Sequence, residues 1–159
     1  MFDPIAALRL VALNLATIAL VTLAIGATAP RWPARWLRSD RGPLRLLGWE
    51  SVELYRGWGF HRLARRLPEA GSAFGGASKR VVPDRSTAAI SAHLVELRRG
   101  EWVHWLSNLS LLPLLAVDPW WLWSAFALMV VAVNLAFIGI LRLNRLRYRS
   151  LSERLGQSD

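Results

Sequence analysis

Three stretches of the chain are apolar over roughly the length of a membrane-spanning helix. Residues 5–26 carry a single charge, and as a helix this run would extend about 33 Å, more than the ~30 Å hydrocarbon core of a bilayer. Residues 103–117 and 120–141 are also apolar, and only Asp118 and Pro119 separate them. This break predicts a helical hairpin whose tip lies at the far membrane face. The first arm is about one turn too short, so the residues before it must complete the span.

The segment between the first span and the hairpin mixes apolar and basic residues. Residues 44–67 have helical propensity and apolar positions among arginines, which predicts an amphipathic helix in the plane of the membrane interface. Gly57 and Gly59 are positions at which this helix can break. Further along, Asp84 or Ser86 is placed to cap a helix that runs toward the hairpin. The segment is therefore expected to be helical and membrane-associated.

The distribution of basic residues predicts the orientation in the membrane. Of the 20 Lys and Arg residues, 14 lie between residues 31 and 99 and five follow residue 141. Because short basic loops stay in the cytoplasm, the middle segment and the C-terminus are predicted inside, and the N-terminus and the hairpin tip outside. Tryptophans fit one interfacial belt at each membrane face, formed by Trp32, Trp36, Trp102 and Trp105 and by Trp120, Trp121 and Trp123.

These features predict an all-α membrane protein of the plasma membrane with three transmembrane helices, one N-terminal and two in a C-terminal hairpin. Interfacial amphipathic helices lie between them. At this length one domain is expected. The single membrane domain, residues 1–159, divides into a first span (5–26), a cytoplasmic and interfacial segment (31–102), a second span (103–117), a third span (120–141) and a cytoplasmic tail (142–159).

Composition narrows the classes of function. The net charge of +9 is compatible with nucleic acid, but the basic residues interleave with apolar and aromatic ones beside the spans, which favours anionic membrane lipids as partners. The absence of cysteine excludes disulfides, thiolate metal ligands and a cysteine nucleophile. The three histidines are scattered, so no metal site and no cofactor are expected. A homo-oligomer is compatible with the sequence but not indicated by it.

Residues 96–108 are the strongest candidate for chemistry, because a charged surface there runs directly into an apolar segment. Glu101 and His104 lie three residues apart near one helical stripe. The imidazole suits a general base, so His104 is predicted to take a proton and Glu101 to orient the ring. Asn134, the one strongly polar residue of the third span, is expected to face another helix or a substrate. The structural alternative has His104 hydrogen-bonded to Glu101 or Asn134, and Glu101 paired with Arg145.

Basic side chains near the membrane are predicted to hold the phosphates of a donor or a headgroup. The chief candidates are Arg99, Arg142 and Arg145. Lys79 and Arg80 follow a glycine-rich stretch whose spacing does not match a phosphate-binding loop. Two interpretations of that stretch stay open, a backbone nest that helps the two basic residues to hold an anion and a plain linker.

Several short motifs occur in an order that resembles a known family. They are Leu67-Pro68-Glu69, Phe74-Gly75-Gly76, Lys79-Arg80, Glu96, Arg99-Gly100-Glu101, His104-Trp105, Asn134 and Arg142-Leu143-Asn144-Arg145. From about Pro30 to Arg147 the chain resembles the glycosyl-4,4'-diaponeurosporenoate acyltransferase family of small bacterial membrane proteins. The namesake attaches a fatty acyl chain to the sugar of a glycosylated carotenoid carboxylate. The resemblance implies that Glu96 and Asn144 also belong to the substrate site.

Two departures from the family pattern concern the acceptor. Leu143 stands where the family usually has tyrosine and Ala136 where it usually has proline, so the pocket and its acceptor can differ. The leading hypothesis is an integral-membrane acyltransferase that moves a fatty acyl group from acyl-CoA or another activated acyl lipid to a hydroxyl of a glycolipid or glycosylated carotenoid-like acceptor. The alternative is a non-catalytic lipid-binding or assembly subunit of a membrane enzyme complex. The polar set of Glu101, His104 and Asn134 favours the enzyme, since an anchor does not require it.

Overall fold

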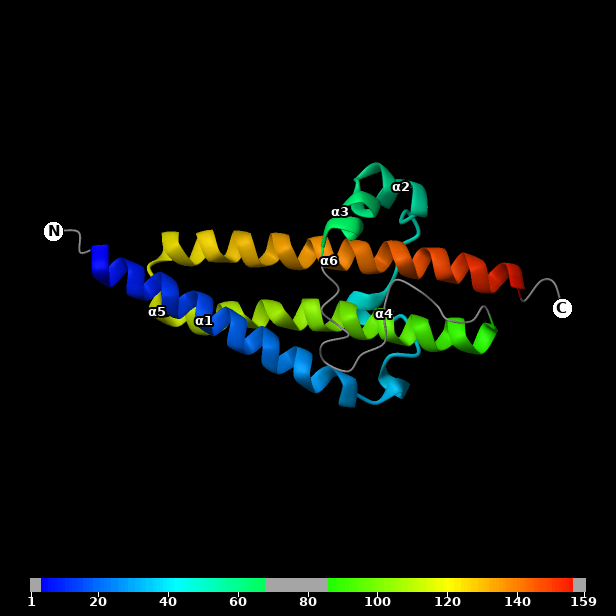
Figure 1. The fold of residues 1–159 in the computed structure, drawn as a ribbon, viewed down its shortest axis with the longest axis horizontal. Helices are drawn as coiled ribbons and strands as arrows, with labels where there is room; N and C mark the ends of the chain where they lie inside the picture. Colours follow the sequence, from blue (N-terminus) through cyan, green and yellow to red (C-terminus); the bar gives the residue numbers. More distant parts are fainter. Residues whose placement is uncertain (1–3, 68–85, 156–159) are drawn as a thin grey trace.

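The computed structural model describes residues 4–67 and 86–155, and all regular elements within these ranges are helical (Figure 1). The predicted all-α class is therefore confirmed for the described residues. The α-helices are α1 (Pro4–Thr28), α2 (Val52–Gly57), α3 (Phe60–Arg66), α4 (Thr87–Ser107), α5 (Leu111–Val117) and α6 (Trp120–Leu155), and short 3-10 turns are η1 (Ala29–Arg31), η2 (Ala34–Trp36), η3 (Gly42–Leu44) and η5 (Asn108–Ser110).

Three long helical units form the body of the protein. α4, η5 and α5 follow one another along most of the length of α6, to which Asp118-Pro119 joins them (Figure 1). Ile90 and Leu97 are buried on α4, which packs against α6. α1 lies across α4 and α5, and its buried Asn14 donates a 2.7 Å hydrogen bond to Asp118 Oδ2. The N-terminal end of α1 thus extends past the turn between α5 and α6 (Figure 1).

Within the described part of the chain, two helices are long and apolar enough to cross a membrane, in the ranges Pro4–Arg31 and Trp120–Leu155. In the first of these helices, only 6% of the most apolar 18-residue stretch is buried inside the protein. Its leucines instead face outward, and Leu128 of α6 is 75% exposed. Apolar surface of this extent requires lipid or another apolar partner, which agrees with a membrane protein.

The predicted second span, residues 103–117, does not form one apolar helix. It comprises the end of α4, the turn η5 and the short α5. Pro113 lacks the N–H that would bond to the carbonyl of residue 109. The Asn108 side chain donates through Nδ2 to the carbonyl of His104. The regular α-helical hydrogen bonding is therefore interrupted here by the 3-10 turn η5. The number of membrane crossings therefore stays a prediction.

The prediction of one amphipathic helix over residues 44–67 is wrong. The chain forms η3, then irregular backbone, then α2 and α3, which lie on the opposite side of α6 from α4 (Figure 1). Ser51 caps α2 by accepting from Leu54 N–H at 3.1 Å, and Gly59 has a φ of 82° that ends the helical path between α2 and α3. The break at the glycines agrees with the prediction, whereas the irregular backbone between η3 and α2 was not predicted.

The start of α4 and the end of α6 were also predicted from the sequence. Ser86 caps α4 by accepting from Ala89 N–H at 3.3 Å, as expected, and Asp84 lies outside the described residues. α6 does not end near residue 141 but continues to Leu155, so most of the predicted cytoplasmic tail is helical. This extension carries the basic residues of the tail on a rigid element.

Candidate functional site

A buried carboxylate joins α4 to α6. Glu101 of α4 is 0% exposed, and its two oxygens bind guanidinium groups of α6. Arg142 Nε donates to Oε1 at 2.8 Å, and Arg145 Nη1 donates to Oε2. A buried charge requires such pairing, since leaving it alone would cost several kcal/mol, about 3–5 when one partner of a pair is removed.

The same two arginines bind the irregular segment that precedes α2. Arg142 Nη1 donates to Glu50 Oε1 at 2.5 Å. Arg145 Nη2 donates to Asp40 Oδ1 at 2.5 Å and to the Leu44 carbonyl at 2.8 Å. These contacts explain why residues 40–50 leave the helical path, because their carboxylates and carbonyls supply acceptors for buried guanidinium groups.

A third arginine completes the cluster. Arg98 of α4 donates to Asp40 Oδ1 at 2.6 Å and to the Leu37 carbonyl at 3.4 Å. Three carboxylates therefore meet three guanidinium groups of equal and opposite formal charge, and the more exposed Arg149 lies 4.0 Å from Asp40 Oδ2 at the edge of the cluster. We call it the carboxylate–arginine network, formed by Asp40, Glu50, Arg98, Glu101, Arg142 and Arg145.

Tyr55 of α2 borders this network. Its hydroxyl donates to Glu50 Oε2 at 3.2 Å. Burial, together with the negative charge of Glu50, raises the pKa of Tyr55 to about 12. The phenol therefore stays protonated near neutral pH and acts as a hydrogen-bond donor.

His104 belongs to a second centre, one turn of α4 from Glu101. Its Nδ1 lies 3.0 Å from Asn134 Oδ1, and its ring stacks on Phe137 with centroids 4.6 Å apart and planes 3° apart. The Asn134 amide nitrogen donates to the Val130 carbonyl at 3.1 Å. Because a carbonyl oxygen only accepts, Nδ1 carries the proton and Nε2 of the neutral ring carries the lone pair. Such a ring has the tautomer that a general base needs.

The predicted catalytic pair is thus divided between two centres. The structure brings Glu101 to Arg142 and Arg145, and His104 to Asn134 and Phe137. His104 Nδ1 donates to Asn134 Oδ1, and both oxygens of Glu101 accept from arginines. The catalytic roles of these residues stay predictions.

The remaining predicted substrate residues lie at several places. Arg99 Nη1 donates to Glu96 at 2.7 Å, and Arg99 Nη2 donates to the Trp32 carbonyl at 3.3 Å. Asn144 lines a cavity on the α3 side of α6. Lys79 and Arg80 lie outside the described residues.

The other two histidines have separate surroundings. His93 is buried with its ring edge toward Tyr148, at a centroid distance of 4.5 Å. His61 lines the same cavity as Asn144. Within residues 4–67 and 86–155, no group of three or more His, Cys, Asp or Glu side chains is arranged to hold a metal ion.

The sequence analysis missed Asp40, Glu50, Tyr55 and Arg98. The sequence feature that could have revealed these residues is the small number of acidic residues among the many arginines of residues 31–67. A carboxylate in such a basic segment next to a membrane is expected to have a cationic partner. Which arginine it would meet is not visible in the sequence, because Glu50 and Arg142 are 92 positions apart.

One family model matches the chain. Residues 33–154 match the model described as glycosyl-4,4'-diaponeurosporenoate acyltransferase. The matched range contains the carboxylate–arginine network and the His104 centre but not α1. Comparison with curated proteins and with solved structures gave no match.

Proposed function

This chain belongs to the glycosyl-4,4'-diaponeurosporenoate acyltransferase family, and we propose that it is an integral-membrane acyltransferase. A fatty acyl group moves from acyl-CoA or another activated acyl lipid to a hydroxyl of a glycolipid or glycosylated carotenoid-like acceptor. The observation that carries the proposal is the His104–Asn134 pair, a titratable ring held by a polar side chain of an apolar helix. A helix that only anchors a protein does not require such a pair in lipid.

In the proposed reaction His104 acts as general base. Its Nε2 takes the proton of the acceptor hydroxyl while the hydroxyl oxygen attacks the acyl carbonyl carbon. A new carbon–oxygen ester bond forms, and the bond between the acyl carbon and the donor sulfur or oxygen breaks. The imidazolium then returns its proton to the leaving group. The hydrogen bond from His104 Nδ1 to Asn134 Oδ1 and the stacked Phe137 fix the orientation of the ring.

The carboxylate–arginine network has a positioning role in this proposal. Glu101 lies one turn from His104 on α4, and its arginine partners lie on α6. The network therefore fixes α4, which carries the base, against α6, which carries Asn134 and Phe137. Phosphates of the donor or headgroup bind at the basic end of these helices. The residues proposed for that substrate region are Glu96, Arg99, Asn134, Arg142 and Arg145, with Lys79 and Arg80, whereas Asn144 lines the cavity on the α3 side of α6.

We further propose three membrane crossings, the second formed by the end of α4 with η5 and α5. The N-terminus then lies outside and the C-terminus in the cytoplasm. The arginine distribution supports this orientation, and the exposed Leu112 and Leu115 of α5 support its contact with lipid. Single cysteines introduced near Ser72 and Gln157 should react with a membrane-impermeant reagent only in opened cells. Labelling of either in intact cells would contradict the orientation.

A second candidate is a non-catalytic lipid-binding or assembly subunit. The observation that favours it is the extent of internal pairing, because Glu101, Arg142 and Arg145 bind one another and the backbone. Such pairing stabilises a scaffold without any substrate.

Lipid analysis of cells distinguishes the two candidates. Lipid extracts of cells with and without the protein are compared by mass spectrometry, with a His104→Gln strain as the third sample. The enzyme predicts an acylated glycolipid or carotenoid that depends on the protein and on His104. An unchanged lipid profile in all three strains would favour the non-catalytic subunit.

A further inference from the structure

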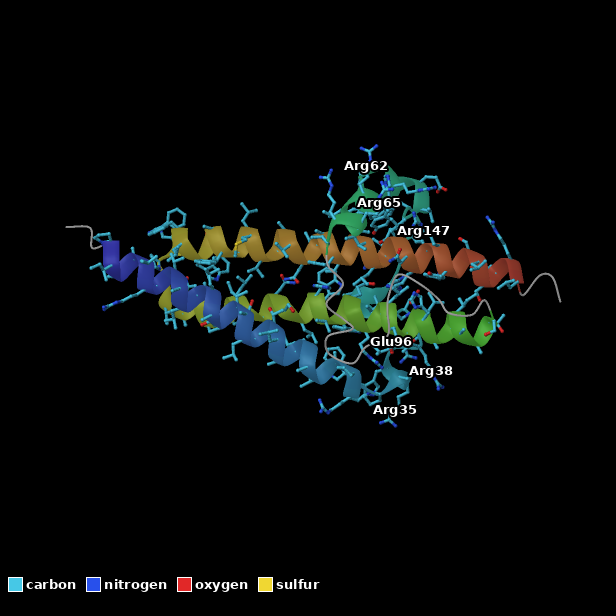
Figure 2. The ribbon with its side chains drawn as sticks, viewed as in Figure 1. Arg35, Arg38, Arg62, Arg65, Glu96 and Arg147 are labelled. Atoms are coloured by element: carbon cyan, nitrogen blue, oxygen red, sulfur yellow. The ribbon has the colours of Figure 1, made fainter. Side chains whose placement is uncertain are left out.

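A basic cavity lies on the face of α6 that α3 covers. It has a volume of about 340 Å³, which is within the range of small-ligand pockets. Figure 2 shows Arg65 and Arg147 on this side of α6, and Arg35 and Arg38 on the opposite side of the molecule. The polar side chains that line the cavity come from α2, α3 and α6 and are Arg56, His61, Arg65, Asn144 and Arg147.

The cations of this cavity have no acidic partner within residues 4–67 and 86–155. Among the residues that the structure describes, Arg56, Arg65 and Arg147 form no salt bridge, and no carboxylate lines the cavity. His61 Nδ1 is buried there without a hydrogen-bond partner in the described part of the chain. Arg56, Arg65 and Arg147 are exposed at this cavity, where their like charges favour an anion, and the buried His61 Nδ1 is a polar atom of the kind that normally has a partner. An anion with several acceptor oxygens would match these donors.

The surroundings of the cavity indicate where this anion comes from. Leu143 and Arg147 follow the apolar part of α6 by only a few residues. In the segment that carries α2 and α3, Trp49 is 60% exposed and Trp58 is 59% exposed. Exposed tryptophan beside arginine is typical of the headgroup level of a membrane, and basic pockets between helices on the cytoplasmic side bind anionic headgroups.

We propose that the α3–α6 cavity binds the phosphate headgroup of an anionic membrane phospholipid. Arginine forks match the paired oxygens of a phosphodiester, and one such group offsets part of the charge of three guanidinium groups. The bound lipid would hold α2 and α3 against the membrane surface. This inference rests on the membrane location of the protein and not on acyl transfer.

The cavity is separate from the His104 centre. Leu143 and Asn134 are nine residues apart on α6, which at about 100° per residue places them on opposite faces of the helix. A lipid headgroup in the cavity therefore lies away from the proposed base. It acts as a structural ligand rather than as the acyl acceptor.

Native mass spectrometry of the detergent-solubilised full chain tests the proposal. The protein is titrated with phosphatidylglycerol, with phosphatidylcholine, and separately with inorganic phosphate and coenzyme A. We expect retention of one phosphatidylglycerol with about 10-fold or greater preference over phosphatidylcholine, which two to three arginine contacts supply. Equal retention of the two lipids would overturn the proposal, and so would coenzyme A or phosphate competing fully with phosphatidylglycerol.

A matched pair of variants locates the site. Arg65→Gln with Arg147→Gln should lower phosphatidylglycerol affinity about 10-fold or more, whereas Arg35→Gln with Arg38→Gln removes the same charge from the opposite side and should leave affinity within about twofold. Equal losses in both double variants would show general charge attraction and contradict a site. If the first double variant does not fold, Arg147→Gln alone serves, with an expected loss of about fivefold. Acyl transfer does not enter these measurements, so their failure is distinct from failure of the proposed enzyme.

Discussion

The carboxylate–arginine network and the His104 centre lie one helical turn apart on α4, but the side chains that form them differ in charge. In the network, the oxygens of Glu101 are bound by guanidinium groups, and Arg145, which is 1% exposed, is bound by carboxylates and a carbonyl. In the His104 centre the contacts of the imidazole include a neutral amide and a phenyl ring. The difference indicates that the most charged cluster stabilises the fold, while the less charged one is suited to proton transfer. Variants in the two clusters should therefore affect different quantities.

The largest effect is expected for Glu101→Gln. The substitution leaves Arg142 and Arg145 with a neutral partner in a buried position, so the free energy of unfolding should fall by about 3–5 kcal/mol. Thermal unfolding in detergent micelles measures the change. Glu153→Gln is the control, because its 3.2 Å pair with Arg149 is exposed and should contribute under about 1 kcal/mol. Equal melting temperatures for the two variants would show that the network is not structural.

Gly139→Ala should give the next largest effect, and it tests how α3 is held on α6. A Cβ on Gly139 would lie 2.4 Å from the Phe60 ring, so the ring must move. Overpacking of this kind costs about 1–3 kcal/mol, although alanine itself favours the helix. In a Phe60→Ala background the same change should be neutral or stabilising. A destabilisation that persists there would mean that Phe60 is not the obstacle.

Asn134→Ala should reduce turnover more than stability. The imidazole loses the acceptor that fixes Nδ1, and turnover should fall about fivefold for a hydrogen bond of about 1 kcal/mol. The cost in unfolding free energy should be only about 0.6 kcal/mol, as for other polar contacts between membrane helices. Turnover per folded molecule and the melting temperature are measured on the same preparation. A large loss of stability with normal turnover would move Asn134 from the chemistry to the scaffold.

The smallest effect concerns pH and Tyr55. Its folded-state pKa of about 12 lies above the ordinary value of 10.0, so the unfolded chain releases the phenolic proton first as pH rises. Stability from this group is therefore complete below pH ~10 and decreases between pH ~10 and ~12. Tyr55→Phe should flatten this decrease in alkaline unfolding curves. An identical slope in the variant would assign the decrease to other groups.

Some elements follow from local sequence and others depend on distant contacts. The apolar runs at residues 5–26 and 120–141 correspond to α1 and to the first part of α6, because composition alone determines such helices. The path of residues 40–50 is determined by arginines about 100 positions later, as in the contacts of Arg145 with Asp40 and Leu44. Local helix propensity contains no information on contacts between residues so far apart in the sequence. The predicted helix over residues 44–67 was therefore wrong.

The leading hypothesis paired Glu101 with His104, whereas in the structure Glu101 binds arginines and His104 bonds to Asn134. Helical spacing correctly put Glu101 and His104 on neighbouring turns of α4. Their partners lie on α6, 41 and 30 positions away, and only the packing of the two helices determines which side chains meet. The structural alternative, in which Glu101 pairs with Arg145 and His104 bonds to Asn134, describes the observed contacts. Catalysis and that arrangement are compatible, since an oriented base also needs a partner.

The most direct test of the central claim is acyl transfer by His104→Gln beside His93→Gln. Both substitutions replace a histidine of α4 by the same residue, and only His104 lies at the proposed reaction centre. Purified variants in lipid nanodiscs are assayed with labelled acyl donor and the acceptor identified from cells. The account predicts that His104→Gln inserts and melts normally and loses about 10²-fold or more in turnover, whereas His93→Gln keeps near-normal turnover. A correctly inserted His104→Gln protein with undiminished turnover would contradict it.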